Sequence, residues 1–233
     1  SFTGGGELDN GTTFSLTSTG NDSFGISSST TTITTPSLGS FSIGSSSGSA
    51  SYMYDEEVPT AYEQVSDGKD TMANKVGDFM DNNSVVYTSP TFEMMGASIT
   101  AHLGYTPQAN DKAVGDGAQV TYDATIGAGK EAGITIGYEG LKLGFYGSER
   151  ERTTPQATAS SGAYETDEFN GAWYAKYTMG PVSIGYSETY MDAGVTQSTS
   201  ITTINTAKSE RTSAGLFEGE QMSIAFNVND NLS

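Results

Sequence analysis

The chain has 233 residues, of which 35% are hydrophobic, and its formal net charge at pH 7 is −18, from 28 acidic and 10 basic side chains. The apolar share lies below the roughly 45–50% of ordinary globular domains, which argues against a large apolar interior and favours a thin apolar band on one side of a sheet. The acidic balance argues against nucleic acid as a partner, because phosphate binding needs a basic surface. Without cysteine the chain can form no disulfide, thiolate metal site or cysteine nucleophile.

Segments with strict two-residue alternation follow one another along the chain. In Ala97–Tyr105, Ile99 and Leu103 share one face while Thr100 and His102 share the other. This period is typical of β-strands with one apolar and one polar face. With the shorter strand-like stretches near the start, we count ten or eleven strands. The residues expected on the apolar face are Ile99, Leu103, Ile134, Leu143, Phe145, Trp173, Tyr177 and Ile184.

Short and long connections alternate between these strands. Tight turns rich in Gly, Asn, Asp and Pro are expected at residues 9–11, 36–39, 93–96, 139–140, 180–181 and 229–231. Longer connections are expected at residues 45–83, 106–130, 148–168 and 188–218. This alternation predicts an up-and-down antiparallel meander with the long loops on one side. Ala118–Ile126 also alternates, and we interpret it as a strand extension or a small hairpin within its loop.

An apolar face on every strand must be covered, and several arrangements remain open. A lipocalin-type barrel turns this face inward, and a secreted solenoid can show the same alternation. In an outer-membrane barrel this face contacts lipid and the polar face lines a watery lumen. In a secreted or surface β-sandwich of adhesin type it packs against a second sheet, and long polar loops bind the ligand. The low apolar content and the 13 tyrosines favour the barrel. No uncharged apolar run approaches the roughly 18 residues of a membrane helix.

One long connection, Tyr54–Asn83, carries eight carboxylates and two lysines. Loops longer than about 15 residues usually have a function. Within it, Asp70–Met80 has apolar residues at helical spacing, which predicts a short helix with one apolar face. Such a loop, folded into a wide barrel, would narrow the lumen and place charge where ions pass. The alternative is a solvated surface loop, because charge runs are usually solvated.

Signals for catalysis or metal binding are weak. Residues 44–48, GSSSG, match the G-x-S-x-G nucleophile pattern but lack the following helix that the pattern requires. His102 is the only histidine and lies on an alternating strand, so we interpret it as a lumen residue. One histidine and no cysteine leave no zinc or copper site. Loop carboxylates could hold Ca²⁺, which oxygen ligands suit, but no EF-hand spacing appears. We therefore expect no enzyme activity and no cofactor, and we assign no metal-ligating residue.

Four stretches together resemble a known family: ELDNGTTFSLT at residues 7–17, LGSFSIG at 38–44, the acidic loop, and DNNSVVYTSPTFEMMGASITAHLGY at 81–105. They are similar to the trimeric general diffusion porins of Gram-negative bacteria, especially those of alphaproteobacteria such as marine oligotrophs. The resemblance spans most of residues 1–233 and is most specific at 81–105. It implies an all-β, antiparallel up-and-down transmembrane β-barrel whose long loop, residues 48–83 here, folds inward as a constriction.

The family's constriction loop carries acids that face basic residues on the opposite wall. The residues of the matching acidic loop here are Asp55, Glu56, Glu57, Glu63, Asp67, Asp70, Asp78 and Asp81. The family's wall is rich in arginine on the first strands, yet this chain has no Arg or Lys before Lys69. The remaining wall candidates are His102, Lys142, Lys176, Arg150 and Arg152. The wall is then either weakly basic or supplied by strands that this sequence does not include. The resemblance implies a passive, cation-preferring channel for ions and small hydrophilic solutes.

The resemblance also implies an assembly and a location. Barrels of this family have about sixteen strands, so we expect the chain, which opens on strand and turn without a signal peptide, to be part of a longer barrel. The expected partners are outer-membrane lipid and lipopolysaccharide, other subunits of a homotrimer, and small solutes and cations, but no nucleic acid. The expected location is the outer membrane of a Gram-negative bacterium. The residues expected at the subunit interface are Phe14, Leu16, Phe24, Ile26, Phe41 and Ile43.

Overall fold

A computed structural model describes residues 1–20, 25–44, 49–54, 57–60, 84–107, 109, 126–152, 167–192 and 216–227. These residues form twelve β-strands and one turn of 3₁₀ helix. The elements are β1 (Phe2–Glu7), β2 (Thr13–Gly20), β3 (Ile26–Thr35), β4 (Gly39–Gly44), η1 (Ala50–Met53), β5 (Ser84–Thr88), β6 (Phe92–Met94), β7 (Ala97–Thr106), β8 (Ile126–Tyr138), β9 (Leu141–Arg152), β10 (Glu168–Met179), β11 (Val182–Asp192) and β12 (Leu216–Phe226).

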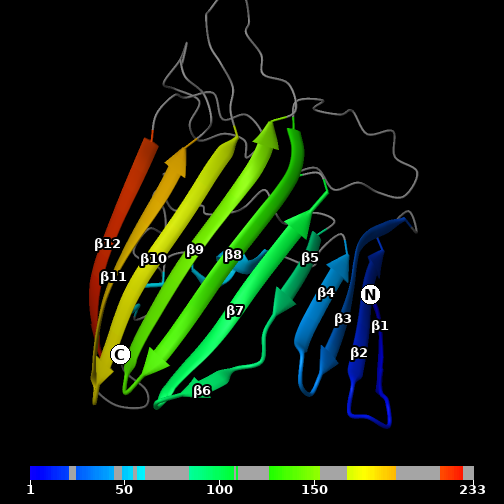
Figure 1. Cartoon of the computed structure of the whole chain (residues 1–233), viewed down its shortest axis with the longest axis horizontal. Helices are drawn as coiled ribbons and strands as arrows, with labels where there is room; N and C mark the ends of the chain where they lie inside the picture. The colour runs from blue at the N-terminus through cyan, green and yellow to red at the C-terminus, as the bar shows by residue number, and fades with distance from the viewer. Residues whose placement is uncertain are drawn as a thin grey trace, which may run out of the picture.

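All the strands belong to one antiparallel sheet with the order β1-β2-β3-β4-β5-β7-β8-β9-β10-β11-β12 (Figure 1). Apart from β6, which pairs with β7 beyond the end of β5, strands that are neighbours in sequence are neighbours in the sheet, which confirms the predicted up-and-down meander. The short turns lie together at one end of the sheet (Figure 1). β1 and β12 form the two ends of the described sheet.

β5 and β6 explain why twelve strands are observed and ten or eleven were predicted. Both pair with β7, with Thr88 opposite His102 and Phe92 opposite Ile99, so they follow one line along the same neighbour. Pro90 lies between them and has no N–H to give to the ladder, which interrupts the strand. At this break the Ser89 hydroxyl accepts a hydrogen bond from Ala101 N at 2.9 Å.

The described turns follow the sequence prediction, while the turn predicted at residues 229–231 lies outside the described residues. The strands extend further than predicted. Gly11 and Gly140 have φ values of 79° and 86°, a conformation that glycine reaches without strain. At the other end of the sheet, β9 continues to Arg152 and β11 to Asp192. Both faces of these strand ends carry polar residues, so alternation of hydrophobicity disappears there although backbone pairing continues.

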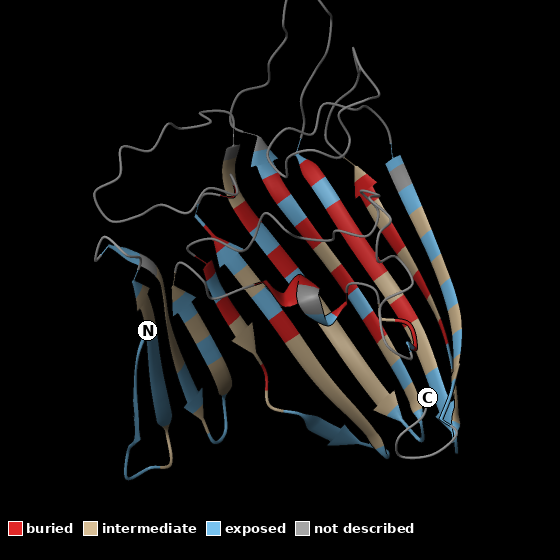
Figure 2. Cartoon of the chain, turned by 180° about the vertical axis from the view of Figure 1, so that it is seen from behind, coloured by how far each residue is buried: buried red, intermediate tan, exposed pale blue. Residues whose placement is uncertain are grey.

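Residues 49–54 and 57–60, which we call the strap, pack on one face of the sheet, with η1 in front of its middle strands (Figure 2). We call this the strap face and the opposite side the outer face. Buried residues gather on β7–β11, whereas no described residue of β1–β4 is buried (Figure 2). On β11 every second residue from Gly185 to Met191 is buried. The interior is therefore a layer between the strap and the wall, and many of its side chains are polar.

Candidate functional site

The strap begins with a capped turn. The Ser49 side chain accepts a hydrogen bond from Ser51 N at 3.1 Å, and Tyr54 N donates to Ser51 O at 2.8 Å. Ser49 has φ −125° and ψ 148°, the extended backbone typical of an N-cap residue. This local bonding satisfies part of the backbone of the turn, which lets it cross the sheet without pairing as a strand.

Glu131 on β8 anchors the start of the strap. Its carboxylate accepts hydrogen bonds from Ser49 Oγ at 2.6 Å, from Ala50 N at 2.8 Å and from Tyr146 Oη at 2.8 Å. The side chain is buried, and it lies against Gly104 of β7, where a Cβ would stand 2.1 Å from Glu131 Oε1. Glycine at 104 therefore provides the space for the carboxylate that ties the strap to the wall.

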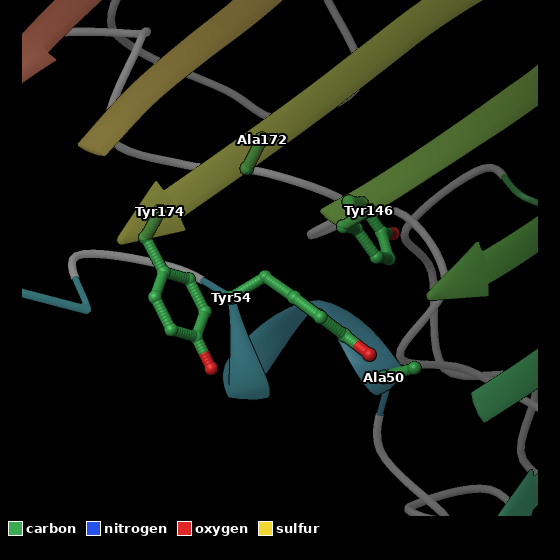
Figure 3. Close-up of a cluster of buried hydrophobic side chains, with 5 residues drawn as sticks. All are labelled: Ala50, Tyr54, Tyr146, Ala172 and Tyr174. Atoms are coloured by element: carbon green, nitrogen blue, oxygen red, sulfur yellow. The ribbon is translucent and has the colours of Figure 1, made fainter. Parts of the chain in front are cut away.

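Tyr54 ends the first part of the strap and lies within the aromatic layer. Figure 3 shows its side chain extending between Tyr174 and Tyr146, and its ring stacks on Tyr146 with centroids 5.3 Å apart. Its phenol oxygen lies 2.6 Å from His102 Nδ1. A Cβ on Gly133 of β8 would stand 2.4 Å from the Tyr54 ring, so only glycine leaves room for it.

The Tyr54 phenol stays neutral. Burial raises the pKa of Tyr54 well above its ordinary value of 10, and the nearby Tyr174 and Glu131 raise the pKa further. A charged phenolate in this layer would lose its hydration. The strap therefore contacts His102 through a neutral phenol at all physiological pH values.

The second part of the strap carries a charged contact. Glu57 Oε2 accepts a hydrogen bond from Lys176 Nζ at 2.8 Å and lies 3.5 Å from Lys142 Nζ. Lys142 and Lys176 are directly opposite each other on β9 and β10. Lys142 Nζ also lies 5.5 Å from the centroid of the Tyr174 ring, a cation–π distance.

Two further contacts hold the strap beyond Glu57. The Ser223 hydroxyl of β12 donates a hydrogen bond to the Pro59 carbonyl oxygen. Gly185 of β11 lies under Pro59, and a Cβ there would stand 2.3 Å from Pro59 Cδ. Contacts therefore run from β7 to β12, across most of the covered part of the sheet.

A separate buried ion pair lies on the strap face nearer the long-loop end of the strands. Arg150 of β9 pairs with Glu168 of β10, and both side chains are fully buried. Arg150 Nη1 also donates to Ala109 O at 3.1 Å, and Asn170 Nδ2 donates to Glu168 Oε1 at 3.4 Å. A buried pair of this kind depends on both partners, because either charge alone would be costly.

The predicted site residues are only partly brought together. His102, Lys142, Lys176 and Arg150 all lie on the strap face, and the side chain of Arg152 is outside the described part of the structure. Glu57 is the described member of the acidic set. The other members of the acidic set lie outside the described residues: Asp55, Glu56, Glu63, Asp67, Asp70, Asp78 and Asp81. The predicted helix at 70–80 lies outside them as well.

Sequence reasoning missed the two carboxylates that matter most on the strap face, Glu131 and Glu168. Glu131 sits in residues 129–133, GKEAG, where no long alternating run surrounds it, and Glu168 begins its strand. A carboxylate on a polar strand face has the same sequence pattern whether water or protein covers it. The flanking Gly104 and Gly133 were the available signal, since small residues on a strand face mark a close approach.

The outer face carries the apolar residues that alternation predicted. Leu103, Phe145, Tyr177 and Ile184 are all more than 40% exposed on this face. Trp173 Nε1 donates to Glu188 at 2.9 Å, and the Tyr186 and Tyr190 hydroxyls donate to the same carboxylate. Exposed apolar side chains edged by such aromatic residues are typical of the lipid-facing surface of a membrane barrel.

Within the described residues, no group of histidine and carboxylate side chains could hold a metal ion. His102 is buried against Tyr54. Gly44 of the GSSSG stretch ends β4, and residues 45–48 are outside the description. No helix in the described ranges has the length and hydrophobicity to cross a membrane.

The comparisons with known proteins agree with this architecture. A family model described as Gram-negative porin matches residues 1–218. Comparison with curated proteins gives no match, and comparison with solved structures gives none. The family match covers nearly the whole chain, and it is consistent with the antiparallel up-and-down sheet. The chain therefore belongs to the Gram-negative porin family.

Proposed function

We propose that this porin prefers cations and that residues 48–83 form its constriction. As a member of its family it is a passive channel for small solutes in the outer membrane of a Gram-negative bacterium, and the family indicates a channel rather than an enzyme. The alternative of a ligand-binding β-sandwich is not favoured, because the described strands form one sheet.

The proposed cation preference rests on charge. Residues 54–83 together with the wall residues Lys142 and Lys176 contain eight carboxylates and four lysines, a surplus of four negative charges. In a lumen with low-dielectric walls these charges are screened less than on an open surface, where the Debye length is about 8 Å. Cations would therefore be concentrated there and anions depleted.

The observation that carries the proposed constriction is the position of the strap. Its contacts with Glu131, His102, Lys176 and Ser223 place the start of this connection against the polar face of the wall. A segment held there would bring the rest of the acidic connection into the lumen.

We also propose a homotrimer of the alphaproteobacterial type. Phe14, Leu16, Phe41 and Ile43 are exposed on the first strands, and burying them against another subunit would remove apolar surface from lipid and headgroups. Ile26 is exposed as well, while Phe24 lies outside the described residues. We further propose that additional strands pair with β1 and β12 to close a barrel of about sixteen strands, because unpaired sheet edges are not viable in lipid.

The charge proposal is tested by reversal potentials in a salt gradient. The variant Asp55→Asn, Glu56→Gln, Asp78→Asn, Asp81→Asn leaves Glu57 intact and should lose much of the cation preference, most clearly at low ionic strength. Asp9→Asn, in a short turn at the other end of the sheet, is the matched control and should leave the potential unchanged. An unchanged reversal potential in the fourfold variant would reject this loop as the ion filter.

A further inference from the structure

We propose that Lys142 and Lys176 are positioning residues of the channel: they hold the strap against the wall through Glu57, and they do not act as free charges of the ion filter. This inference rests on the proposed role of residues 48–83 as the constriction. It assigns to the two wall lysines a role that differs from the one expected from the resemblance, in which basic wall residues face the acidic loop across the lumen.

The geometry of the three charges supports this role. Lys142 and Lys176 are opposite each other in the β9–β10 ladder, so their side chains leave the wall side by side. Both ammonium groups approach the same oxygen, Glu57 Oε2, at 3.5 and 2.8 Å. A single carboxylate held between two ammonium groups is fixed in position more firmly than in one exposed pair.

The exposure of Lys176 and Glu57 points the same way. Their side chains are 28% and 24% exposed, so both are partly covered, whereas the Lys142 side chain is 46% exposed and makes the weaker of the two contacts. A lysine that serves as a filter must present its charge to passing ions, whereas Lys176 directs Nζ to the strap. Glu57 is likewise engaged with the wall, which removes it from the acids free to attract cations.

The neutral contacts next to Glu57 show that this part of the strap is fitted to the wall. Pro59 packs over Gly185, where any larger residue would collide with the ring. Val58 is buried, and the Pro59 carbonyl accepts a hydrogen bond from Ser223. The two lysines thus add a charged contact at Glu57 to a part of the strap that is already complementary in shape to the wall.

A unique thiol can report whether the strap is docked, because the chain has no cysteine. Ser223 is partly buried beneath the Pro59 carbonyl. In the Ser223→Cys background we therefore expect the docked strap to slow the reaction of the thiol with an uncharged maleimide, and a lifted strap to make it faster. Glu57→Gln and Lys176→Met should each increase the reaction rate by about two- to fivefold, the effect expected when a partly exposed ion pair is lost. Lys142→Met should have a smaller effect because its distance to Glu57 is longer.

The direction in which Glu57→Gln and Lys176→Met shift the reaction rate distinguishes loss of the strap contact from a change in the electrostatic potential at the thiol. Removing a negative charge near a thiol lowers the thiol pKa and speeds its reaction, whereas removing a positive charge does the reverse. If the three groups only set the local potential, Glu57→Gln and Lys176→Met would shift the rate in opposite directions. The anchor predicts that both speed the reaction and that the double variant is no faster than the faster single variant.

Conservative and unrelated changes complete the test. Lys176→Arg, and the exchanged pair Glu57→Lys with Lys176→Glu, should keep the slow rate because each retains a pair. Lys130→Met, on the outer face of β8, should leave the rate unchanged. Circular dichroism checks that each variant is folded. If Lys176→Met does not fold, the maleimide reaction rates of Lys176→Arg and Lys142→Met are compared instead. Opposite shifts, or no change in Lys176→Met, would overturn the proposal.

This outcome is distinguishable from that of the proposed function. The reversal-potential experiment changes Asp55, Glu56, Asp78 and Asp81 and leaves the anchor intact. The reversal potential can therefore reject the acidic loop as the ion filter while the thiol assay still detects the anchor. Equally, the thiol assay can reject the anchor while the reversal potential supports the filter.

Discussion

Glu131→Ala should release the start of the strap. The change removes the carboxylate that accepts hydrogen bonds from Ser49 Oγ, Ala50 N and Tyr146 Oη. The donors are buried between the strap and the wall, where alanine provides no acceptor. The backbone N–H of Ala50 has then lost its acceptor, and it can form a hydrogen bond with water only if the turn opens.

The size of the effect follows from the Ala50 contact. A hydrogen bond to a charged group contributes about 1.5–3 kcal/mol. If the free energy of local opening at Ala50 falls by this amount, amide exchange should become about 10- to 150-fold faster, because each 1.4 kcal/mol is a factor of ten. The loss of the Ser49 contact acts on the same opening and makes the lower limit conservative.

Hydrogen exchange with mass spectrometry on the detergent-solubilised porin measures this directly. Peptides covering residues 49–54 should lose protection, while peptides from β2 and β3 should not change. Glu149→Ala is the matched control. It removes an exposed carboxylate of β9 that follows Ser148, the residue paired with Glu131 in the β8–β9 ladder. If Glu131→Ala leaves protection at 49–54 unchanged in a folded protein, the carboxylate is not an anchor and the reasoning fails.

Three other predictions concern the same layer. Gly133→Ala places a Cβ 2.4 Å from the Tyr54 ring and should lower stability by about 1–3 kcal/mol in urea unfolding; an unchanged midpoint would contradict the close approach. Arg150→Met leaves Glu168 buried without this partner and should cost about 3–5 kcal/mol, less when combined with Glu168→Gln. Because the folded-state pKa of Tyr54 is raised, its stabilising contribution should persist through neutral pH and disappear only as pH rises through that pKa. The difference in tyrosinate absorbance between wild type and Tyr54→Phe should therefore titrate above the ordinary tyrosine pKa, and a midpoint at or below it would contradict burial of the phenol.

The strands and their faces could be predicted because their signal is local. Alternation at Ile99–Leu103 and at Leu141–Phe145 placed apolar side chains on one face, and the structure confirms that arrangement. The tight turns were equally readable, since Gly11 and Gly140 adopt conformations that few other residues tolerate. The strand ends were predicted too short because both of their faces carry polar residues, which interrupts the two-residue period of hydrophobicity there.

The contacts of the strap could not be predicted in the same way. Glu57 and Lys176 are 119 positions apart, and Ala50 and Glu131 are 81 apart. Sequence alone grouped Glu57 with seven other acids of the same connection, because it carries no signal for which carboxylate meets a lysine. The register of β9 against β10 makes that choice, since it sets Lys142 beside Lys176.

The sequence by itself determined an all-β meander with an apolar side, a polar side and an acidic long connection, because period-two patterning and turn chemistry depend only on near neighbours. Only the tertiary structure decided which polar residues are covered. Glu131 and Glu168 are buried, whereas Glu149 on the same region of wall is exposed, although all three are carboxylates on strands. The difference arises because strand register and the crossing of the strap bring distant groups together, and burial of a charge is tolerable only where those groups supply its hydrogen bonds.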